Sequence, residues 1–218
     1  MKKFILIAVF LIAGFTVVYA QTGFLAGAKL GAEFGFSKAS GDIKKWADAL
    51  SVSYDEKSQA AFTLGFYGGF GITNKLAVLA EMDLYFGQGI RLDFSAADYK
   101  VRYSSLDIPI LLRYAFVQSK VSFGLLAGPY FSFPLSAKKD YSGSGSTWTG
   151  TNAFDTGGMT TGALGGLFLS YSTGRGRIMA DLRLLFDFTP LKDADDAEIL
   201  NRRGVVLTVG YEFSFGGK

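Results

Sequence analysis

The sequence contains no cysteine and no histidine among its 218 residues. Without cysteine the chain forms no disulfide, has no thiolate metal ligand or thiol nucleophile, and offers no cysteine for lipid attachment. Without histidine it lacks the side chain that most often serves as a general base and as a transition-metal ligand. Since these absences exclude much of enzyme chemistry, we expect no catalytic residues, no metal site and no cofactor.

The sequence also lacks a large excess of positive or negative charge. The formal net charge is only +3, and 49% of the residues are hydrophobic. That hydrophobicity is too high, and that charge too low, for a disordered chain. Lys2 and Lys3 lie in a predicted leader, and removing these two lysines lowers the net charge from +3 to +1. A nucleic-acid partner therefore has no electrostatic support.

The first residues have the three-part layout of a secretory signal peptide. Met1-Lys2-Lys3 is positively charged, Phe4–Val18 is almost entirely apolar, and Ala20 suits a cleavage site. The alternative is a transmembrane helix, but about 15 apolar residues are short for a span of about 20. We therefore predict a signal peptide over residues 1–20 and one exported domain over 21–218.

Long hydrophobic runs are missing from the rest of the chain, so no helical membrane span is expected there. Apolar and polar residues alternate instead, as where Leu84 and Phe86 alternate with Asp83 and Tyr85. A period of two indicates β-strands. Most of the segments that show it are longer than the usual length of about five or six residues. The eight predicted strands are 24–36, 60–71, 76–94, 102–116, 121–135, 158–172, 177–189 and 203–215.

Short and long connections alternate between these strands. Thr73-Asn74-Lys75, Gln118-Ser119-Lys120 and Thr173-Gly174-Arg175-Gly176 are rich in turn-forming residues. Longer loops lie near 37–59, 95–100, 136–157 and 190–202. Tight turns at one end and long loops at the other are typical of an outer-membrane barrel with both termini in the periplasm.

The bulk of each strand face separates a membrane barrel from a soluble, lipocalin-like one. One face carries large apolar residues such as Phe66, Phe123 and Phe186, and the other is mostly Gly, Ala, Ser and Thr with a few charges. Because the interior of an eight-stranded barrel is just wide enough for side chains, the small face fits inside. We predict an all-β, eight-stranded antiparallel up-and-down barrel in the bacterial outer membrane, with a soluble barrel as the alternative. The facing of strand 158–172 stays open.

Several segments resemble a known family. Ser105–Tyr114 (SLDIPILLRY) resembles a strand of the PorT-like outer-membrane β-barrel proteins, and Leu125–Ser132 (LLAGPYFS) resembles the strand after it. Phe154–Tyr171 and Arg202–Phe213 are similar to two later strands. The resemblance covers most of the predicted barrel. It implies the barrel fold and, through the family name, an accessory role in a secretion apparatus.

Charged residues on the inward face gather at similar heights above the tight turns. Three cations and three anions are expected in the lower lumen: Lys29, Glu81, Arg113, Asp181, Arg183 and Glu212. Charges persist in a low-dielectric interior only when they are paired and hydrogen-bonded. We therefore predict a plug of salt bridges, with a gate that exchanges partners to open a narrow conduit as the alternative. The upper lumen has an acidic bias that would favour cations, from Glu33, Asp83, Asp107 and Asp187.

Two of the long loops carry aromatic residues. In 37–59, Asp42 suits the start of a short helix whose apolar edge includes Trp46. That edge either folds onto the barrel mouth or exposes a patch for a partner. In 136–157, Tyr141 and Trp148 stand among Ser, Gly and Thr, a composition that suits adaptable recognition or plain flexibility.

These patterns leave three functions open. The first is a non-enzymatic envelope protein that stabilises the membrane or presents loops 37–59 and 136–157 to a protein partner. The second is a narrow channel or a transporter of a small hydrophobic or cationic ligand. The third, implied by the resemblance alone, is an accessory to a secretion apparatus. In each case the chain contacts the outer-membrane bilayer, with lipopolysaccharide or an equivalent lipid in the outer leaflet.

Overall fold

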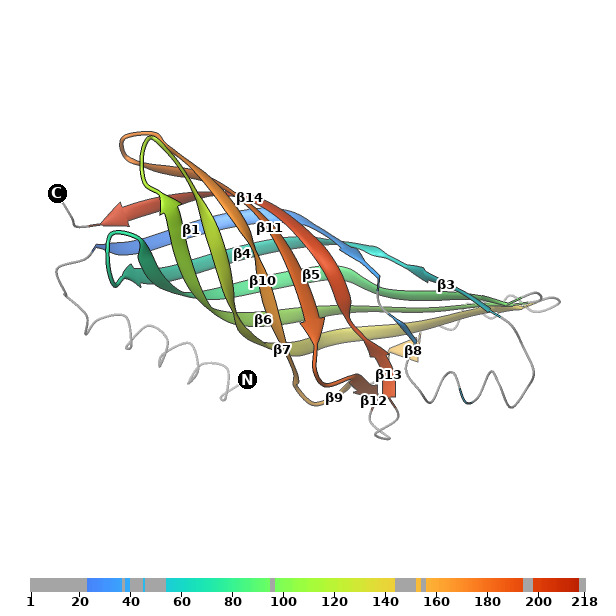
Figure 1. Cartoon of the computed structure of the whole chain (residues 1–218). Helices are drawn as coiled ribbons and strands as arrows, with labels where there is room; N and C mark the ends of the chain where they lie inside the picture. The colour runs from blue at the N-terminus through green and yellow to red at the C-terminus, as the bar shows by residue number, and fades with distance from the viewer. Residues whose placement is uncertain are drawn as a thin grey trace.

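The computed structural model describes residues 23–36, 38–39, 45, 54–94, 97–143, 152–153, 156–193 and 198–215. The predicted signal peptide lies outside these residues, as does the predicted helix around Trp46 except for Lys45, so both stay predictions. Within the described part, no helix has the length and apolar character needed to cross a membrane. The described chain consists almost entirely of β-strands and the turns between them (Figure 1).

Eight antiparallel strands close into a barrel, which confirms the predicted fold class. Their ring order is β10, β11, β14, β1, β4, β5, β6, β7, and the pairing of β7 with β10 closes the ring. The strands are β1 (Phe24–Gly35), β4 (Ala60–Gly71), β5 (Leu76–Phe94), β6 (Ala97–Val117), β7 (Val121–Gly143), β10 (Thr160–Ser172), β11 (Gly176–Asp187) and β14 (Arg203–Phe215).

The bulky face of each strand points outward, as predicted. On β4, Phe66 is 57% exposed while Thr63 is 1% exposed. Cross-strand pairs such as Phe66 with Met82 join these outward residues into a continuous apolar surface. A soluble barrel would bury that surface, whereas a bilayer accommodates it.

Three tight turns connect strands at one end of the barrel, which we call the turn end. The turn between β4 and β5 is closed by Thr73, whose Oγ1 accepts hydrogen bonds from the backbone N–H of Lys75 (3.2 Å) and Leu76 (3.1 Å). In the turn between β10 and β11, Gly174 has a φ of 90°, which favours glycine. The predicted positions of these turns are confirmed.

Strand β10, whose facing the sequence left open, turns its even-numbered residues inward. Phe168 is 5% exposed and Ser170 is 2% exposed, whereas Leu167 between the inward positions is 54% exposed. Gly166 also lies on the inward face, where a Cβ would come within 2.8 Å of the Arg183 backbone. The glycines of β10 had hidden the alternation because they occur on both faces.

Strands β6 and β7 are longer than predicted, β5 has the predicted bounds, and all three project beyond the ring (Figure 1). The last pair between β7 and β10 is Ser132 with Thr160, and β7 continues for roughly 36 Å beyond it at about 3.3 Å per residue. The register of β5 shifts between Tyr85 and Gln88. Beyond this bulge β5 pairs with β3 (Tyr54–Ser58) instead of β4. We call the projecting parts of β3, β5, β6 and β7 the projecting sheet.

Short strands form a second, four-stranded sheet at the end opposite the tight turns (Figure 1). It contains β2 (Lys38–Ala39), β9 (Thr156–Gly157), β12 (Leu191–Asp193) and β13 (Glu198–Asn201). One more strand, β8 (Asn152–Ala153), pairs with β7 at Lys138 and Lys139. None of these short strands was predicted, since each is too brief for a period of two to emerge.

The lumen holds larger side chains than the sequence indicated. Tyr67, Tyr130 and Phe168 are buried inside it, although we expected mainly small residues and charges. Glycines on nearby strands make the space: a Cβ on Gly162 would lie 2.5 Å from Tyr130 Cζ, and one on Gly124 would lie 2.7 Å from Phe168 Cε1. Small residues of the inward face therefore leave the space in which aromatic rings pack.

Candidate functional site

The middle of the lumen holds five charged side chains, which we call the mid-lumen cluster: Lys29, Glu81, Asp83, Asp181 and Arg183. Lys29 Nζ donates to Glu81 and, at 2.9 Å, to Asp83 Oδ2. Arg183 donates from Nη1 and Nη2 to the two oxygens of Glu81 (2.5 and 3.1 Å) and from Nη2 to Asp181 Oδ2 (2.6 Å). Paired cations and hydrogen bonds offset the cost of burying these carboxylates.

A glycine allows the two halves of this cluster to meet. Lys29 on β1 and Asp83 on β5 both pair with Gly65 on the intervening strand β4. A Cβ on Gly65 would overlap Asp83 Oδ1 and would lie 2.7 Å from Lys29 Cε. The ion pair between Lys29 and Asp83 therefore passes over β4 at a position that has no side chain.

A second ion pair crosses the lumen closer to the turn end. Arg113 on β6 donates from Nη1 and Nη2 to the two carboxylate oxygens of Glu212 on β14, at 2.5 and 3.2 Å. Its guanidinium carbon lies 5.5 Å from the centre of the Phe168 ring, within the range of a cation–π contact. The six charges that the sequence placed at similar heights thus divide between two levels.

Arg202 forms the third level, and the sequence analysis did not identify it as a lumen residue. It lies between β13 and β14 and is only 2% exposed. Its Nε and Nη2 donate to the two oxygens of Glu33 at 2.9 and 2.8 Å, and its Nη1 donates to Asp107 Oδ2 at 2.5 Å. The guanidinium also lies 4.3 Å from the centre of the Tyr85 ring.

The upper carboxylates have further donors around them. Asp107 Oδ1 accepts hydrogen bonds from Ser105 (2.9 Å) and Ser132 (2.5 Å). Gln88 donates to Glu33 at 2.9 Å. Asp187 accepts from the Tyr130 hydroxyl. This upper network is therefore organised around a cation that the predicted acidic upper lumen did not include.

The structure brings the predicted lumen residues together differently from the expected arrangement. Asp83, expected in the upper lumen, belongs to the mid-lumen cluster through Lys29. Glu33 and Asp107 both bind Arg202. The signal that could have revealed Arg202 was the acidic excess predicted for the upper lumen. Buried carboxylates need a cation, and Arg202 was not yet assigned to any partner. The side chains of Trp46, Tyr141 and Trp148 lie outside the described residues.

Some buried polar atoms of the lumen have no hydrogen-bond partner. They include Asp83 Oδ1, Asp181 Oδ1, Thr63 Oγ1, Arg183 Nε and the Tyr67 hydroxyl. Buried polar groups of this kind are commonly satisfied by ordered water. Across the described residues, no group of three or more acidic side chains is arranged to hold a metal ion.

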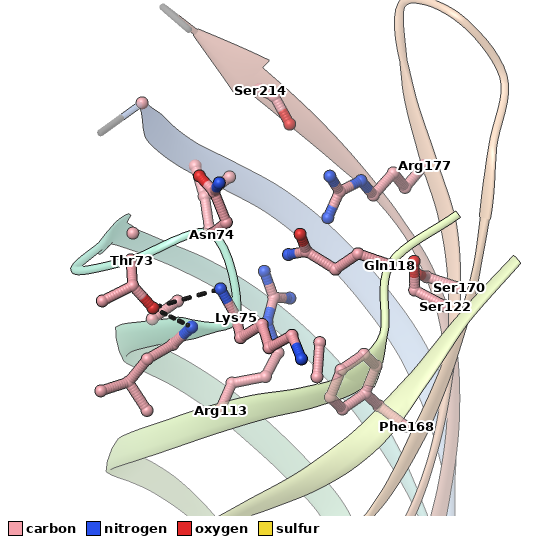
Figure 2. A pocket seen from close by; sticks show the side chains of 16 residues that line it. Thr73, Asn74, Lys75, Arg113, Gln118, Ser122, Phe168, Ser170, Arg177 and Ser214 are labelled. Atoms are coloured by element: carbon pink, nitrogen blue, oxygen red, sulfur yellow. Dashed lines mark hydrogen bonds between the residues drawn. The ribbon is translucent and has the colours of Figure 1, made fainter. Parts of the chain in front are cut away.

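At the turn end the lumen opens into a cavity of about 280 Å³, which we call the turn-end vestibule (Figure 2). Figure 2 shows Lys75, Arg113, Gln118 and Arg177 directed into it from different strands and turns. Phe168 forms an apolar part of its wall. The vestibule is therefore bounded by the Arg113–Glu212 level on one side and by the tight turns on the other.

Residues 19–216 match the family described as outer membrane protein beta-barrel domain. The chain belongs to this family. No curated protein matches the sequence. As a member of the family it is an outer-membrane β-barrel protein, and the predicted bacterial outer-membrane localisation is confirmed. The finer resemblance to PorT-like barrels stays a prediction.

The chain is similar in structure to several small barrels. Neisserial surface protein A shares 18% identity over 88% of this chain and 97% of that one, with a TM-score of 0.48. Ail of Yersinia pestis, solved in complex with the heparin analogue sucrose octasulfate, shares 15% identity over 88% and 99%, with a TM-score of 0.44. The N-terminal barrel of Pseudomonas aeruginosa OprF shares 12% identity over 88% and 99%, with a TM-score of 0.41.

Proposed function

We propose that this outer-membrane barrel is a non-enzymatic envelope protein, closed to solutes, whose rigid wall supports the projecting sheet for interaction outside the cell. The proposal that the lumen is closed rests on one observation, which is that ion pairs connect opposite walls of the barrel. In the ring order, β11 and β5 are four steps apart, and Arg183 joins them through Glu81. Strands β6 and β14 are also four steps apart, and Arg113 joins them through Glu212.

Arg202 adds a third bridge near the opposite end. Entering from the link before β14, it binds Asp107 on the opposing strand β6 as well as Glu33 on β1. Three successive cross-lumen bridges leave a solute no straight passage. The same bridges fix the relative positions of the strands that carry the projecting sheet.

The absence of histidine and the pairing of the lumen carboxylates support a non-enzymatic role. A general acid or base has to exchange a proton with a substrate within hydrogen-bond reach. Here Glu81 and Glu212 each accept two hydrogen bonds from an arginine. Carboxylates held in this way brace the wall of the barrel.

The projecting sheet suits contact with an outer-leaflet lipid such as lipopolysaccharide. On its outward face Arg102 pairs in register with Lys138, and Arg91 pairs with Lys100 on the next rung. Asp140 follows Lys100 on that rung and accepts a hydrogen bond from Arg102 Nη2 at 2.9 Å, so four cations face one carboxylate. The rung beyond that opposes Asp93 and Asp98, so the basic residues lie nearest the barrel. That order places positive charge toward anionic headgroups and leaves the end of the projecting sheet, beyond the rung of Asp93 and Asp98, for a protein partner.

A channel or small-ligand transporter is the second candidate. The polar atoms without partners in the mid-lumen cluster favour it, because water beside them would form part of a conduit. An accessory role in secretion rests only on the resemblance to PorT-like barrels. Both alternatives require a lumen or a surface that changes its conformation. Three cross-lumen bridges favour a barrel with a fixed conformation.

Conductance in a planar lipid bilayer tests the closed lumen. We expect stable insertion without steady current for the wild type and for Arg113→Ala, because the bridges at Arg183 and Arg202 remain. Arg175→Ala, in an exposed tight turn, is the matched control. Steady openings in the wild type, or openings that appear only in Arg113→Ala, would contradict a closed barrel and support a gated one.

Site-specific photocrosslinking in intact cells tests the display role. A photoreactive residue at Lys138, exposed on the projecting part of β7, should give a protein adduct. The same residue at Leu125, on the lipid-facing part of the same strand, is the control and should give none. Equal adducts at both positions, or none at Lys138, would argue against a partner at the projecting sheet.

A further inference from the structure

The turn-end vestibule has an excess of positive charge that the ion pairs of the lumen do not neutralise. It is lined by three cationic side chains, Lys75, Arg113 and Arg177. Glu212 is fully buried beside it, and Arg113 occupies both of its oxygens. One carboxylate thus faces three cations, which leaves an excess of two positive charges at the mouth.

That carboxylate makes no hydrogen bond to the other two cations. Arg177 Nη1 lies 4.0 Å from Glu212 Oε1, at the outer limit of an ion pair and beyond hydrogen-bond distance. In the described part of the chain, no carboxylate lies within ion-pair distance of Lys75 Nζ. Both side chains are exposed or half-buried, so they can reorient toward a ligand without breaking a buried pair.

Neutral donors complete the lining. Ser122, Ser170 and Gln118 contribute hydroxyl and amide groups to the same cavity, and Phe168 contributes an apolar wall (Figure 2). A guanidinium fork with hydroxyl and amide donors matches the several oxygens of a carboxylate or a phosphate better than it matches a spherical halide. A volume of about 280 Å³ accommodates such a group with a few attached carbon atoms.

We propose that the turn-end vestibule is a binding site for an oxyanion, a carboxylate or a phosphate on a small molecule or on the end of a narrow chain. Lys75 and Arg177 supply the charge, and Ser122, Ser170 and Gln118 supply further hydrogen bonds. Because tight turns of outer-membrane barrels face the periplasm, the ligand enters from that side. The site is independent of the closed lumen and of the projecting sheet, since it requires neither a through-passage nor the loops.

Nuclear magnetic resonance titration of the refolded protein in detergent micelles tests the site, at constant ionic strength maintained with sodium chloride. The probes are inorganic phosphate and N-acetyl-dialanine, with the amide of the same dipeptide as the uncharged control. Saturable shifts of backbone signals at Lys75, Gln118 and Arg177 are expected with at least one oxyanion. Phosphate alone, or the dipeptide acid alone, would identify which source the site prefers, and both results support it.

Two variants and a matched control complete the test. Lys75→Gln with Arg177→Gln should weaken the binding of the oxyanion at least tenfold while the spectrum of the folded barrel is retained. Lys120→Gln removes one cation from the same end, but Lys120 lies over the Tyr171 ring and outside the vestibule lining. It should leave binding unchanged.

Three results would overturn the proposal. One is the absence of saturable shifts with either oxyanion. Another is equal shifts with the dipeptide amide, which would indicate binding through the peptide groups. The third is an equal loss of affinity in Lys120→Gln, which would indicate general attraction to a positively charged rim.

Discussion

Arg183 on β11 binds both carboxylate oxygens of Glu81 on β5, the strand directly opposite in the ring of the barrel. The two residues are 102 positions apart in the sequence. Both are almost fully buried, so their pairing is made without the screening that weakens ion pairs at a surface. A bond of this kind fixes the width of the barrel, because it can persist only while opposite walls keep their distance.

Arg202→Ala should destabilise the barrel strongly. Removing the arginine leaves Glu33 and Asp107 buried at the upper level without the cation that binds both. Removing one partner of a buried ion pair typically costs about 3–5 kcal/mol. Urea unfolding in lipid vesicles, followed by the electrophoretic shift between folded and unfolded forms, measures this loss of stability.

The neighbouring arginine provides the control for that experiment. Arg203 begins β14 and its side chain is exposed, so Arg203→Ala should change stability by less than about 1 kcal/mol. Equal losses in the two variants would mean that general charge, and not the buried contacts of Arg202, stabilises this end of the barrel.

Gly65→Ala should weaken the mid-lumen cluster although it replaces no charged residue. The added methyl group would overlap Asp83 Oδ1 and approach Lys29 Cε within 2.7 Å. Overfilling a packed interior costs about 1–3 kcal/mol. Gly165→Ala is the matched control, since its Cβ would have no neighbour closer than 3.8 Å. Vesicle unfolding should show a loss for Gly65→Ala only; an equal loss for Gly165→Ala would point to backbone effects.

The pattern of the sequence predicts the barrel itself because strand periodicity is a local property. A period of two sets which face a side chain occupies, so the inward positions of Lys29, Glu81 and Arg183 follow from their own strands. Their pairing does not follow, because it depends on the register between strands far apart in the chain. Lys29 reaches Asp83 as well as Glu81 only because Gly65 lies between them in register.

Arg202 shows a second limit. It precedes β14 and belongs to no strand, so no alternation indicates where its side chain points. The aromatic rings inside the barrel are a third case. Tyr130 fits there because Gly162 on the neighbouring strand leaves space, and neither residue alone predicts the contact. The sequence therefore does not predict contacts that depend on the relative positions of several strands.

The stability of the barrel should respond differently to the loss of the hydroxyl group at two buried tyrosines. The Tyr130 hydroxyl donates to Asp187, whereas the Tyr67 hydroxyl is buried without a hydrogen-bond partner. Tyr130→Phe should therefore lower the stability by about 1–3 kcal/mol, because it leaves a partly buried carboxylate with one donor fewer. Tyr67→Phe should leave stability unchanged or raise it. A loss in Tyr67→Phe comparable to that in Tyr130→Phe would indicate that a water molecule bridges the Tyr67 hydroxyl.

The depth of the outward face in the bilayer can be measured with arginine substitutions at two valines. Val209 lies near the middle of β14, and Val121 begins β7 at the turn end; both side chains are exposed on the outward face. A cation on the lipid face of a barrel costs about 2–4 kcal/mol at the bilayer midplane and about 0–1 kcal/mol near the interface. Val209→Arg should therefore reduce the free energy of unfolding in vesicles far more than Val121→Arg. Equal and small effects at both positions would mean that water, not lipid, covers this face, because an exposed arginine has no desolvation cost there.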